Sequence, residues 1–265
     1  MIGPRVSRSS RAAVENAPVL STIAMRRATI YTHRMRSAPV ACALLAAAFA
    51  VAPGCTCSDA AAPSGSVAPP LTAPFSDDFN RVALGPDWKP TDDTAYRIEG
   101  GELIVKQAYN HPMWLTRAIP RDALVEFDCW SNDDAGDLKV EVWGDGKSFA
   151  TDRVGAYTST AYNFIFGGWH NQLATLARMH EHGEDRLTRA DVKVVKGKRY
   201  HWAIRRKGGH IEWTITDAAS GTPVGSAPFF TLDDAQPLEG PGHAFFSFND
   251  WEAELHFDNL KITPL

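Results

Sequence analysis

The chain has 265 residues, 44% of them hydrophobic and 22% charged, which excludes disordered, collagenous, coiled-coil and disulfide-rich scaffold proteins. Its formal net charge of −4 is uneven, because the first 54 residues hold seven Arg and one Glu, and the remaining 211 hold 20 basic and 30 acidic residues, a net −10. An acidic body that contains all eight Trp argues against a nucleic-acid partner, since binding phosphates requires a basic surface.

Residues 1–54 are predicted to form an export leader. Arginines precede an apolar run at 40–52, and small residues follow it, which is the pattern of a secretory signal. The run is too short to cross a bilayer, which takes about 20 apolar residues. The sequence Ala52-Pro53-Gly54-Cys55 is similar to the bacterial lipobox, whose Cys is acylated. We therefore expect lipidation of Cys55, with an ordinary signal peptide as the alternative.

A tether is predicted at 55–74, where the chain consists almost only of Ala, Pro, Ser, Thr and Gly and cannot bury a core. The body of the protein then comprises 75–265. Cys57 lies in the tether and Cys129 in an apolar strand pattern, so a disulfide between them is one alternative and a buried free Cys129 the simpler one. This organisation predicts an extracytoplasmic protein held to the bacterial envelope by a lipid anchor, in the periplasm or at the cell surface.

The body is predicted to be all-β. From Phe75 onward, apolar residues recur with period two in short segments, as in half-buried strands, and no segment keeps a helical period. Gly-Gly pairs at 100–101 and 208–209 predict hairpins, because glycine supplies the positive φ of tight turns. About a dozen strands indicate one antiparallel β-sandwich or jelly roll. Besides the hairpins, strands are predicted at 123–130, 138–143, 161–166, 172–180, 243–248 and 252–262.

Both ends of this body resemble a known fold. The opening Phe75-Ser-Asp-Asp-Phe-Asn80, the Gly-Gly hairpin at 100–101 and the closing Phe257-Asp-Asn-Leu-Lys-Ile262 are similar to bacterial concanavalin A-like (laminin-G-like) jelly-roll domains. A second resemblance, to lipoproteins of this superfamily that accompany polysaccharide-degradation systems, rests on the stretches 167–183, 200–202, 241–244 and 249–252. The resemblance implies that the first and last strands pair. It implies a carbohydrate ligand more weakly, because the fold hosts lectins, glycosidases, lyases and scaffolds.

Two tryptophans are candidate sugar-binding residues. Trp169, flanked by Gly167-Gly168 and His170-Asn171, lies at a strand end where glycine permits close ligand approach, and Trp251 lies in a similar turn. An indole ring can stack on the apolar face of a sugar, although a packing role is an equal alternative for both. Polar contacts to the ligand are predicted from Asn171, Arg178, His180 and Glu181, with a solvated face as the alternative.

The sequence does not identify a set of catalytic residues. Glu126 and Asp128 share one face of a predicted strand, similar to the Glu-x-Asp-x-(x)-Glu of glycosidases with this fold, but Ser131 stands where the third Glu is needed. A solvent-facing role for the two carboxylates is therefore the favoured alternative. If the protein is an enzyme, the candidate classes are a glycoside hydrolase and a polysaccharide lyase, in which Arg178 would neutralise a uronate.

No metal site is predicted. His180 and His182 can share a strand face, but a zinc site needs three or four ligands. The acidic pairs at 77–78, 133–134 and 233–234 could hold Ca²⁺, with solvated turns as the default. The first functional hypothesis is thus an anchored protein that binds a poly- or oligosaccharide on the concave sheet of a jelly roll. The alternatives are an enzyme that uses the same cleft and a non-catalytic structural envelope protein.

Overall fold

The computed structural model describes residues 69–152 and 157–265. The predicted leader, the acylation of Cys55 and most of the predicted tether lie outside the described residues. The last part of the tether contacts the domain: the Leu71 side chain packs against the core, and its N–H donates to the Ala118 carbonyl at 2.9 Å. Contacts with the folded domain therefore begin before the predicted start of the body.

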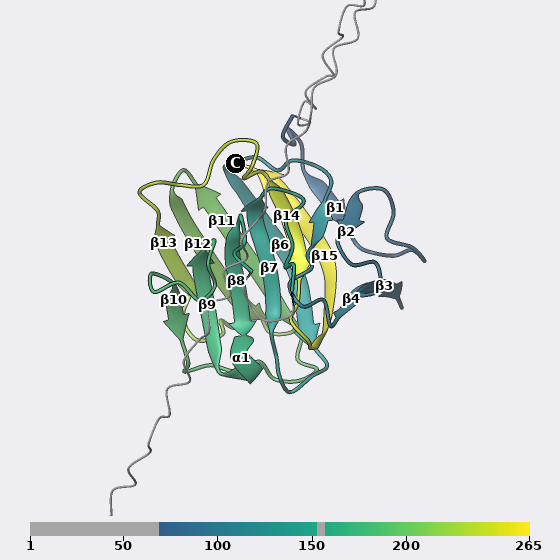
Figure 1. The fold of residues 1–265 in the computed structure, drawn as a ribbon. Helices are drawn as coiled ribbons and strands as arrows, with labels where there is room; N and C mark the ends of the chain where they lie inside the picture. Colours follow the sequence, from purple (N-terminus) through teal and green to yellow (C-terminus); the bar gives the residue numbers. More distant parts are fainter. Residues whose placement is uncertain (1–68, 153–156) are drawn as a thin grey trace, which may run out of the picture. The chain divides into compact units, whose positions relative to one another are not determined.

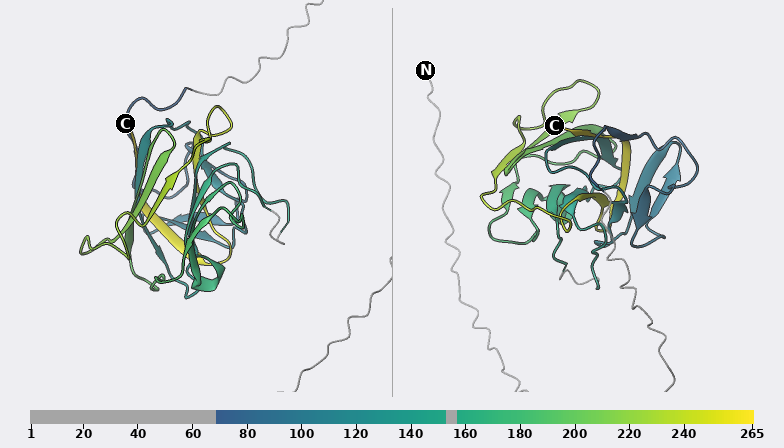
Figure 2. Two further views of the ribbon diagram at one scale, coloured as in Figure 1. Left: turned by 90° about the vertical axis from the view of Figure 1, so that its left-hand side faces the viewer. Right: turned by 90° about the horizontal axis from the view of Figure 1, so that it is seen from above.

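Two antiparallel sheets pack face to face, as Figures 1 and 2 show. Within the described ranges, one sheet has eight strands in the order β13-β12-β11-β6-β15-β4-β3, with β1 beside β15, and the other has seven, in the order β10-β9-β8-β7-β14-β5-β2. The eight are β1 (Phe75–Asp77), β3 (Tyr96–Glu99), β4 (Glu102–Lys106), β6 (Ala123–Ser131), β11 (Tyr200–Lys207), β12 (His210–Asp217), β13 (Phe230–Asp233) and β15 (Glu254–Pro264). The seven are β2 (Trp88–Pro90), β5 (Met113–Leu115), β7 (Leu138–Gly144), β8 (Tyr162–Gly167), β9 (Leu173–Arg178), β10 (Leu187–Arg189) and β14 (Phe245–Asn249).

The predicted strands are confirmed wherever the alternation was long. The six segments predicted outside the hairpins correspond to β6, β7, β8, β9, β14 and β15, with ends that differ by at most two residues. Both predicted hairpins are present, and Gly100, Gly101 and Gly208 adopt the positive φ angles of 65°, 81° and 62° that the turns require. The strands that the pattern missed, β1, β2, β5, β10 and β13, have three or four residues, too few to display a period of two.

The first and last strands pair, as the resemblance implied. Phe75 of β1 faces Ile262 of β15, so the N-terminal entry to the domain and the C-terminus lie at the same end of the sandwich. A one-turn element, α1 (Gly168–Asn171), lies at the opposite end, after β8 (Figure 1). Among the described residues, no helix has the length and apolar character that crossing a membrane requires.

The core lies between the two sheets and consists of their inward-facing side chains. Trp202 and Trp213 are fully buried with ring centroids 4.5 Å apart, so both are packing residues of this core. Each such aromatic contributes roughly 1.5–3 kcal/mol through burial. Cys129 is a buried free cysteine in this core, where burial raises the pKa of its thiol well above the usual value. Its role is therefore the predicted one of a small core residue.

The outer face of the seven-stranded sheet is also buried, although its side chains are polar. Lys139, Glu141, Asn163, Thr175 and Asn249 alternate with core residues along their strands, and each is at most 2% exposed. An antiparallel sheet commonly leaves one face in water. Loop residues cover parts of that face: Tyr157 and Ser159 donate hydrogen bonds to Glu141.

Candidate functional site

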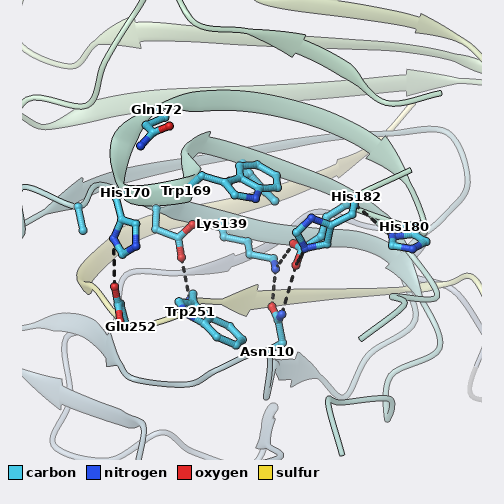
Figure 3. Close-up of a pocket in the computed structure, with 13 residues that line it drawn as sticks. Asn110, Lys139, Trp169, His170, Gln172, His180, His182, Trp251 and Glu252 are labelled. Carbon is cyan, nitrogen blue, oxygen red and sulfur yellow. Dashed lines mark hydrogen bonds and ion pairs between the residues drawn. The ribbon is translucent and has the colours of Figure 1, made fainter. Parts of the chain in front are cut away.

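A pocket of about 810 Å³ opens at the α1 end of this covered sheet face (Figure 3). Its lining combines aromatic rings with titratable side chains from β7, from α1 and from the loops that follow β9 and β14. The volume is in the range of about 300–1,000 Å³ that small-ligand sites occupy. The lining residues are Asn110, Ala135, Asp137, Lys139, Ile165, Trp169, His170, Gln172, His180, Glu181, His182, Trp251 and Glu252.

The element α1 is a left-handed turn that carries Trp169 and His170 into the pocket wall. Trp169 has φ 52° and ψ 55°, His170 has φ 55° and ψ 50°, and Asn171 has φ 61°. For residues other than glycine, this conformation costs roughly 1–2 kcal/mol each and seldom occurs in succession. Such backbone strain concentrates at functional sites, where the surrounding structure holds it in place.

Asn171 holds this turn in place. Its side-chain amide donates to the Val194 carbonyl at 2.8 Å and to the Asp134 carbonyl at 3.3 Å, and its Oδ1 accepts the Val194 N–H at 2.9 Å. Gly167 starts the turn at φ 80°, and a Cβ there would lie 2.6 Å from the Val194 side chain. Asn171 was predicted to contact a ligand, but it does not line the pocket. The structure gives it a positioning role instead.

The two candidate tryptophans meet in the pocket from different loops. Trp169 is half-buried and stands edge-on to His182, with ring centroids 5.4 Å apart. Trp251 is half-buried edge-on to Tyr109 at 5.2 Å, and its backbone N–H donates to Asp137 Oδ2 at 2.8 Å. Figure 3 shows both indoles beside the cavity with Lys139 between them. The predicted proximity of these two residues to one site is therefore present in the fold.

Lys139, Glu181 and Asn110 form a hydrogen-bonded network in the pocket wall. The Lys139 ammonium donates to Glu181 Oε2 at 2.5 Å and to the Asn110 side-chain oxygen, and the Asn110 amide donates to Glu181 Oε1 at 3.3 Å. Burial by itself would raise the pKa of Glu181, but the charge and hydrogen bond of Lys139 outweigh it and lower that pKa. Glu181 is therefore held as a carboxylate.

Asp137 has the opposite protonation preference. It is half-buried in the pocket, and desolvation raises its pKa to about 7, because the charge of Lys139 and the Trp251 N–H offset only part of the burial effect. Asp250 is buried nearby, and desolvation together with the charge of Asp137 raises its pKa well above the usual value. The pocket thus combines a carboxyl that holds a proton near neutral pH with one that stays ionised.

Arg178 does not reach the pocket, although the sequence predicts it as a ligand contact. The alternation of β9 places Ala174, Leu176 and Arg178 on the inner face, and the Arg178 guanidinium donates to Asp234 at 3.0 Å and to the Gln236 carbonyl at 3.1 Å. The strand ends there, and His180 and Glu181 follow in the loop and do line the pocket. Of these predicted ligand contacts, His180 and Glu181 therefore line the pocket and Arg178 does not.

The carboxylates Glu126 and Asp128 lie in the other sheet. They alternate on β6 with the buried Val125, Phe127 and Cys129, and Asp128 is 2.9 Å from His201 Nδ1. Neither lines the pocket. The favoured alternative, a solvent-facing role, describes their position.

Asp137 and Lys139 are the pocket residues that mattered most and were missed. The sequence signal was present, because Asp137 directly before β7 and Lys139 and Glu141 within it place a charge at every second position of an otherwise apolar segment. Charged residues at every second position of a strand normally indicate a solvent-exposed face, and nothing in the sequence indicates that loops cover this one. His170, Gln172 and Glu252 were also missed, and they flank residues that were predicted.

The histidines do not assemble into a metal site. The ring centroids of His180 and His182 are 6.0 Å apart, and in the described part of the chain no three His, Cys, Asp or Glu side chains gather as potential ligands. One member of the acidic pairs has another partner: Asp77 accepts from Arg81 and from the Trp88 indole at 2.7 Å. Calcium at the acidic pairs stays a prediction.

Comparisons with known proteins bear on the fold. No protein-family model and no curated protein matches the chain. Lectin II from Ulex europaeus is 11% identical, with a TM-score of 0.54 over 73% of this chain and 99% of the lectin. A prokaryotic β-1,3-1,4-glucanase (lichenase) derived from a mouse hindgut metagenome is 10% identical, with a TM-score of 0.51 over 73% of this chain and all of the other.

A third solved structure, described as a native glycosidic hydrolase, is 10% identical, with a TM-score of 0.51 over 75% of this chain and 99% of its own. At such identities the likeness concerns the fold alone. The chain has the concanavalin A-like jelly-roll fold of lectins and glycosidases, as the resemblance implied.

Proposed function

We propose that the protein binds a carbohydrate in the pocket, with Trp169 and Trp251 as the stacking surfaces. The observation that carries the proposal is the convergence of two half-buried indoles, from separate loops, on one polar cavity of about 810 Å³. The faces of sugar rings are apolar and stack on aromatic rings, whereas their hydroxyls need hydrogen-bond partners. The lectin and glucanase that share this fold support the same ligand class.

The polar partners for sugar hydroxyls line the same cavity. His182 is exposed beside Trp169, His180 is exposed next to His182, and Gln172 is an exposed residue of the same lining. The strained turn supports this role, because a ligand site on a fixed backbone loses little conformational entropy when the ligand binds. The ligand is thus proposed to lie between the indoles, with imidazole and amide groups around it.

Affinity electrophoresis through gels that contain plant and microbial polysaccharides tests this proposal. We expect at least one polysaccharide to retard the protein and Trp169→Ala to abolish most of the retardation. Phe149→Ala is the matched control, because Phe149 is an exposed aromatic that does not line the pocket. Absence of retardation across the panel, or unchanged retardation of Trp169→Ala, would contradict carbohydrate binding and favour the structural-protein alternative.

A second candidate function, glycoside hydrolysis, rests on the contrast between Asp137 and Glu181. Hydrolysis of a glycosidic bond needs a protonated carboxyl and an ionised one. Asp137, with its pKa raised to about 7 by burial, would donate a proton to the leaving oxygen. Glu181 would either attack the anomeric carbon or take a proton from the attacking water. The lyase alternative loses its predicted uronate partner, since Arg178 is bound to Asp234.

Reducing-end assays on the same panel test the second candidate. New reducing ends are expected to form at mildly acidic pH and to stop forming in Asp137→Asn, while carbohydrate binding by that variant persists. If the wild type is retarded by a polysaccharide but releases reducing ends only at the background rate, the protein binds the polysaccharides of the panel without hydrolysing them.

We also propose that the domain is anchored at the bacterial envelope through acylated Cys55. The basic leader, the short apolar run and the small residues before Cys55 support this location. The wild type is expected to partition into detergent and Cys55→Ser into the aqueous phase. A Cys55→Ser protein that still partitions into detergent would contradict acylation at this residue.

A further inference from the structure

From the walls of the pocket we infer that it takes the terminus of a glycan chain and excludes internal stretches of a polysaccharide. The inference rests on the proposed carbohydrate binding and adds the class of ligand. A site for internal chain segments needs a groove that is open at two ends, so that the polymer can enter and leave. This pocket lies at one end of a sheet face on which Lys139, Glu141 and Trp114 are buried beneath other side chains and loops.

The first closed side of the pocket is the wall toward the centre of the sheet. The Lys139 ammonium bridges Asn110 and Glu181 across this side, and Lys139 is only 2% exposed. Because two hydrogen-bond partners hold the buried ammonium in place, this wall is a fixed part of the structure. A sugar chain in the pocket therefore cannot continue along the sheet past Lys139.

Behind that wall, the space that a polysaccharide would cross is occupied. Glu141 is fully buried and accepts hydrogen bonds from Tyr157 at 3.0 Å, from Ser159 and from Asn249 at 2.6 Å. Farther along, the Trp114 indole is fully buried and donates to the Ser148 carbonyl at 3.1 Å. Loop residues thus cover the sheet face that a groove would need.

The opposite side of the pocket is bounded at its rim by a contact between the two loops that carry the tryptophans. His170 Nδ1 lies 3.3 Å from Glu252 Oε1, which links the α1 turn to the loop after β14, and both side chains are exposed to solvent. Figure 3 shows this contact on one side of the cavity and the Lys139 network on the other, with the indoles between them. A chain that enters between the indoles meets the buried Lys139 network on one side and this contact at the rim on the other, so the pocket fits its end.

The test compares intact polysaccharides with the same polysaccharides after partial acid hydrolysis, at equal mass. For every polysaccharide that retards the protein, tenfold shorter chains carry tenfold more ends per gram. We therefore expect the half-saturating mass concentration to fall about tenfold, since occupancy follows the molar concentration of the bound group. Borohydride reduction of the hydrolysate then shows which end binds, because it alters only the reducing end.

A half-saturating mass concentration that stays constant or rises when the chains are shortened would overturn the inference, because the protein would then bind internal sugar units of the chain. Absence of binding to both intact and shortened chains would instead refute the carbohydrate proposal on which the inference rests. A second measurement uses the double variant His170→Ala and Glu252→Ala, which removes the contact across one side. Intact chains are then expected to gain affinity relative to shortened ones, and an unchanged ratio would contradict the role given to that contact.

Discussion

The ammonium group of Lys139 lies 2.5 Å from the Glu181 carboxylate, and both groups face a pocket that water can enter, yet Lys139 is only 2% exposed. The two residues come from β7 and from the loop after β9, so their contact fixes that loop against the sheet. An ion pair of this kind affects stability mainly through the group that is left when one partner is removed.

Replacing Lys139 with Met is therefore expected to reduce the free energy of unfolding by about 3–5 kcal/mol at neutral pH. The reason is that Glu181, whose side chain is only 12% exposed, would lose its charged partner and keep the weaker hydrogen bond from the Asn110 amide. Denaturant titrations at several pH values measure the effect, with Lys147→Met as an exposed control. Because Lys139 lowers the pKa of Glu181, the stabilisation is present at neutral pH and is lost as the pH falls through that pKa. A loss that does not depend on pH would contradict this account.

Asp137 should also make stability depend on pH, but in the direction opposite to that of Glu181: its contribution falls as the pH rises. Burial raises the pKa of Asp137 to about 7, so between the ordinary value of 3.8 and 7 the folded state binds more protons than the unfolded state. Across that window this carboxyl reduces stability as the pH rises, by up to about 1.4 kcal/mol per pH unit. Asp137→Asn should flatten the decline, whereas Asp134→Asn, at an exposed position, should not. Equal pH profiles of the wild type and Asp137→Asn would refute the shift.

Asn171 should affect binding through the shape of the α1 turn. Asn171→Ala removes the side-chain hydrogen bonds with Val194 and keeps a Cβ at φ 61°, so we expect a loss of about 2–4 kcal/mol of stability. Asn171→Gly loses the same hydrogen bonds but relieves the backbone strain, and should be more stable than the Ala variant by roughly 1 kcal/mol. Both variants are expected to bind carbohydrate more weakly, as affinity electrophoresis of the folded proteins would show. Wild-type affinity in both would mean that Trp169 does not depend on the turn.

Arg178 provides the complementary case of a residue outside the pocket. Arg178→Ala is expected to leave carbohydrate affinity unchanged within about twofold, a difference below about 0.5 kcal/mol. The variant should lose roughly 1–2 kcal/mol of stability, because the Asp234 carboxylate, which is 9% exposed, loses a charged donor. Thermal unfolding and affinity electrophoresis separate the two effects. A large loss of affinity with little change in stability would mean that Arg178 contacts the ligand after all.

Local patterns predicted the fold well because they report on which face of a strand is buried. The alternation in β6 identified its core residues, and the Gly-Gly pairs located two hairpins, since both features act within a few residues. The very short strands were missed for the same reason. β5 has three residues and depends on its partners β2 and β14, which a local pattern does not reveal.

The site was predicted only in part because it depends on loops that converge from distant parts of the chain. Trp169 and Trp251 were found from their glycine-rich or turn-like surroundings. Lys139 was missed, because its burial depends on Asn110 and Glu181, which lie 29 and 42 residues away in the sequence. Arg178 was grouped with His180 and Glu181 as a ligand contact, but the strand ends directly after Arg178, so only the residues that follow it turn into the pocket. Such errors arise where a strand meets a loop and the period of two stops.

The pairing of β1 with β15 has a practical consequence for handling the protein. Phe75 and Ile262 lie side by side at the end of the sandwich that is farthest from α1, so both ends of the domain leave it on the side away from the pocket (Figure 1). Attachment to a bead, a sensor chip or a fusion partner through either end thus leaves the entrance between Trp169 and Trp251 unobstructed. A ligand in solution approaches the immobilised domain from its free side.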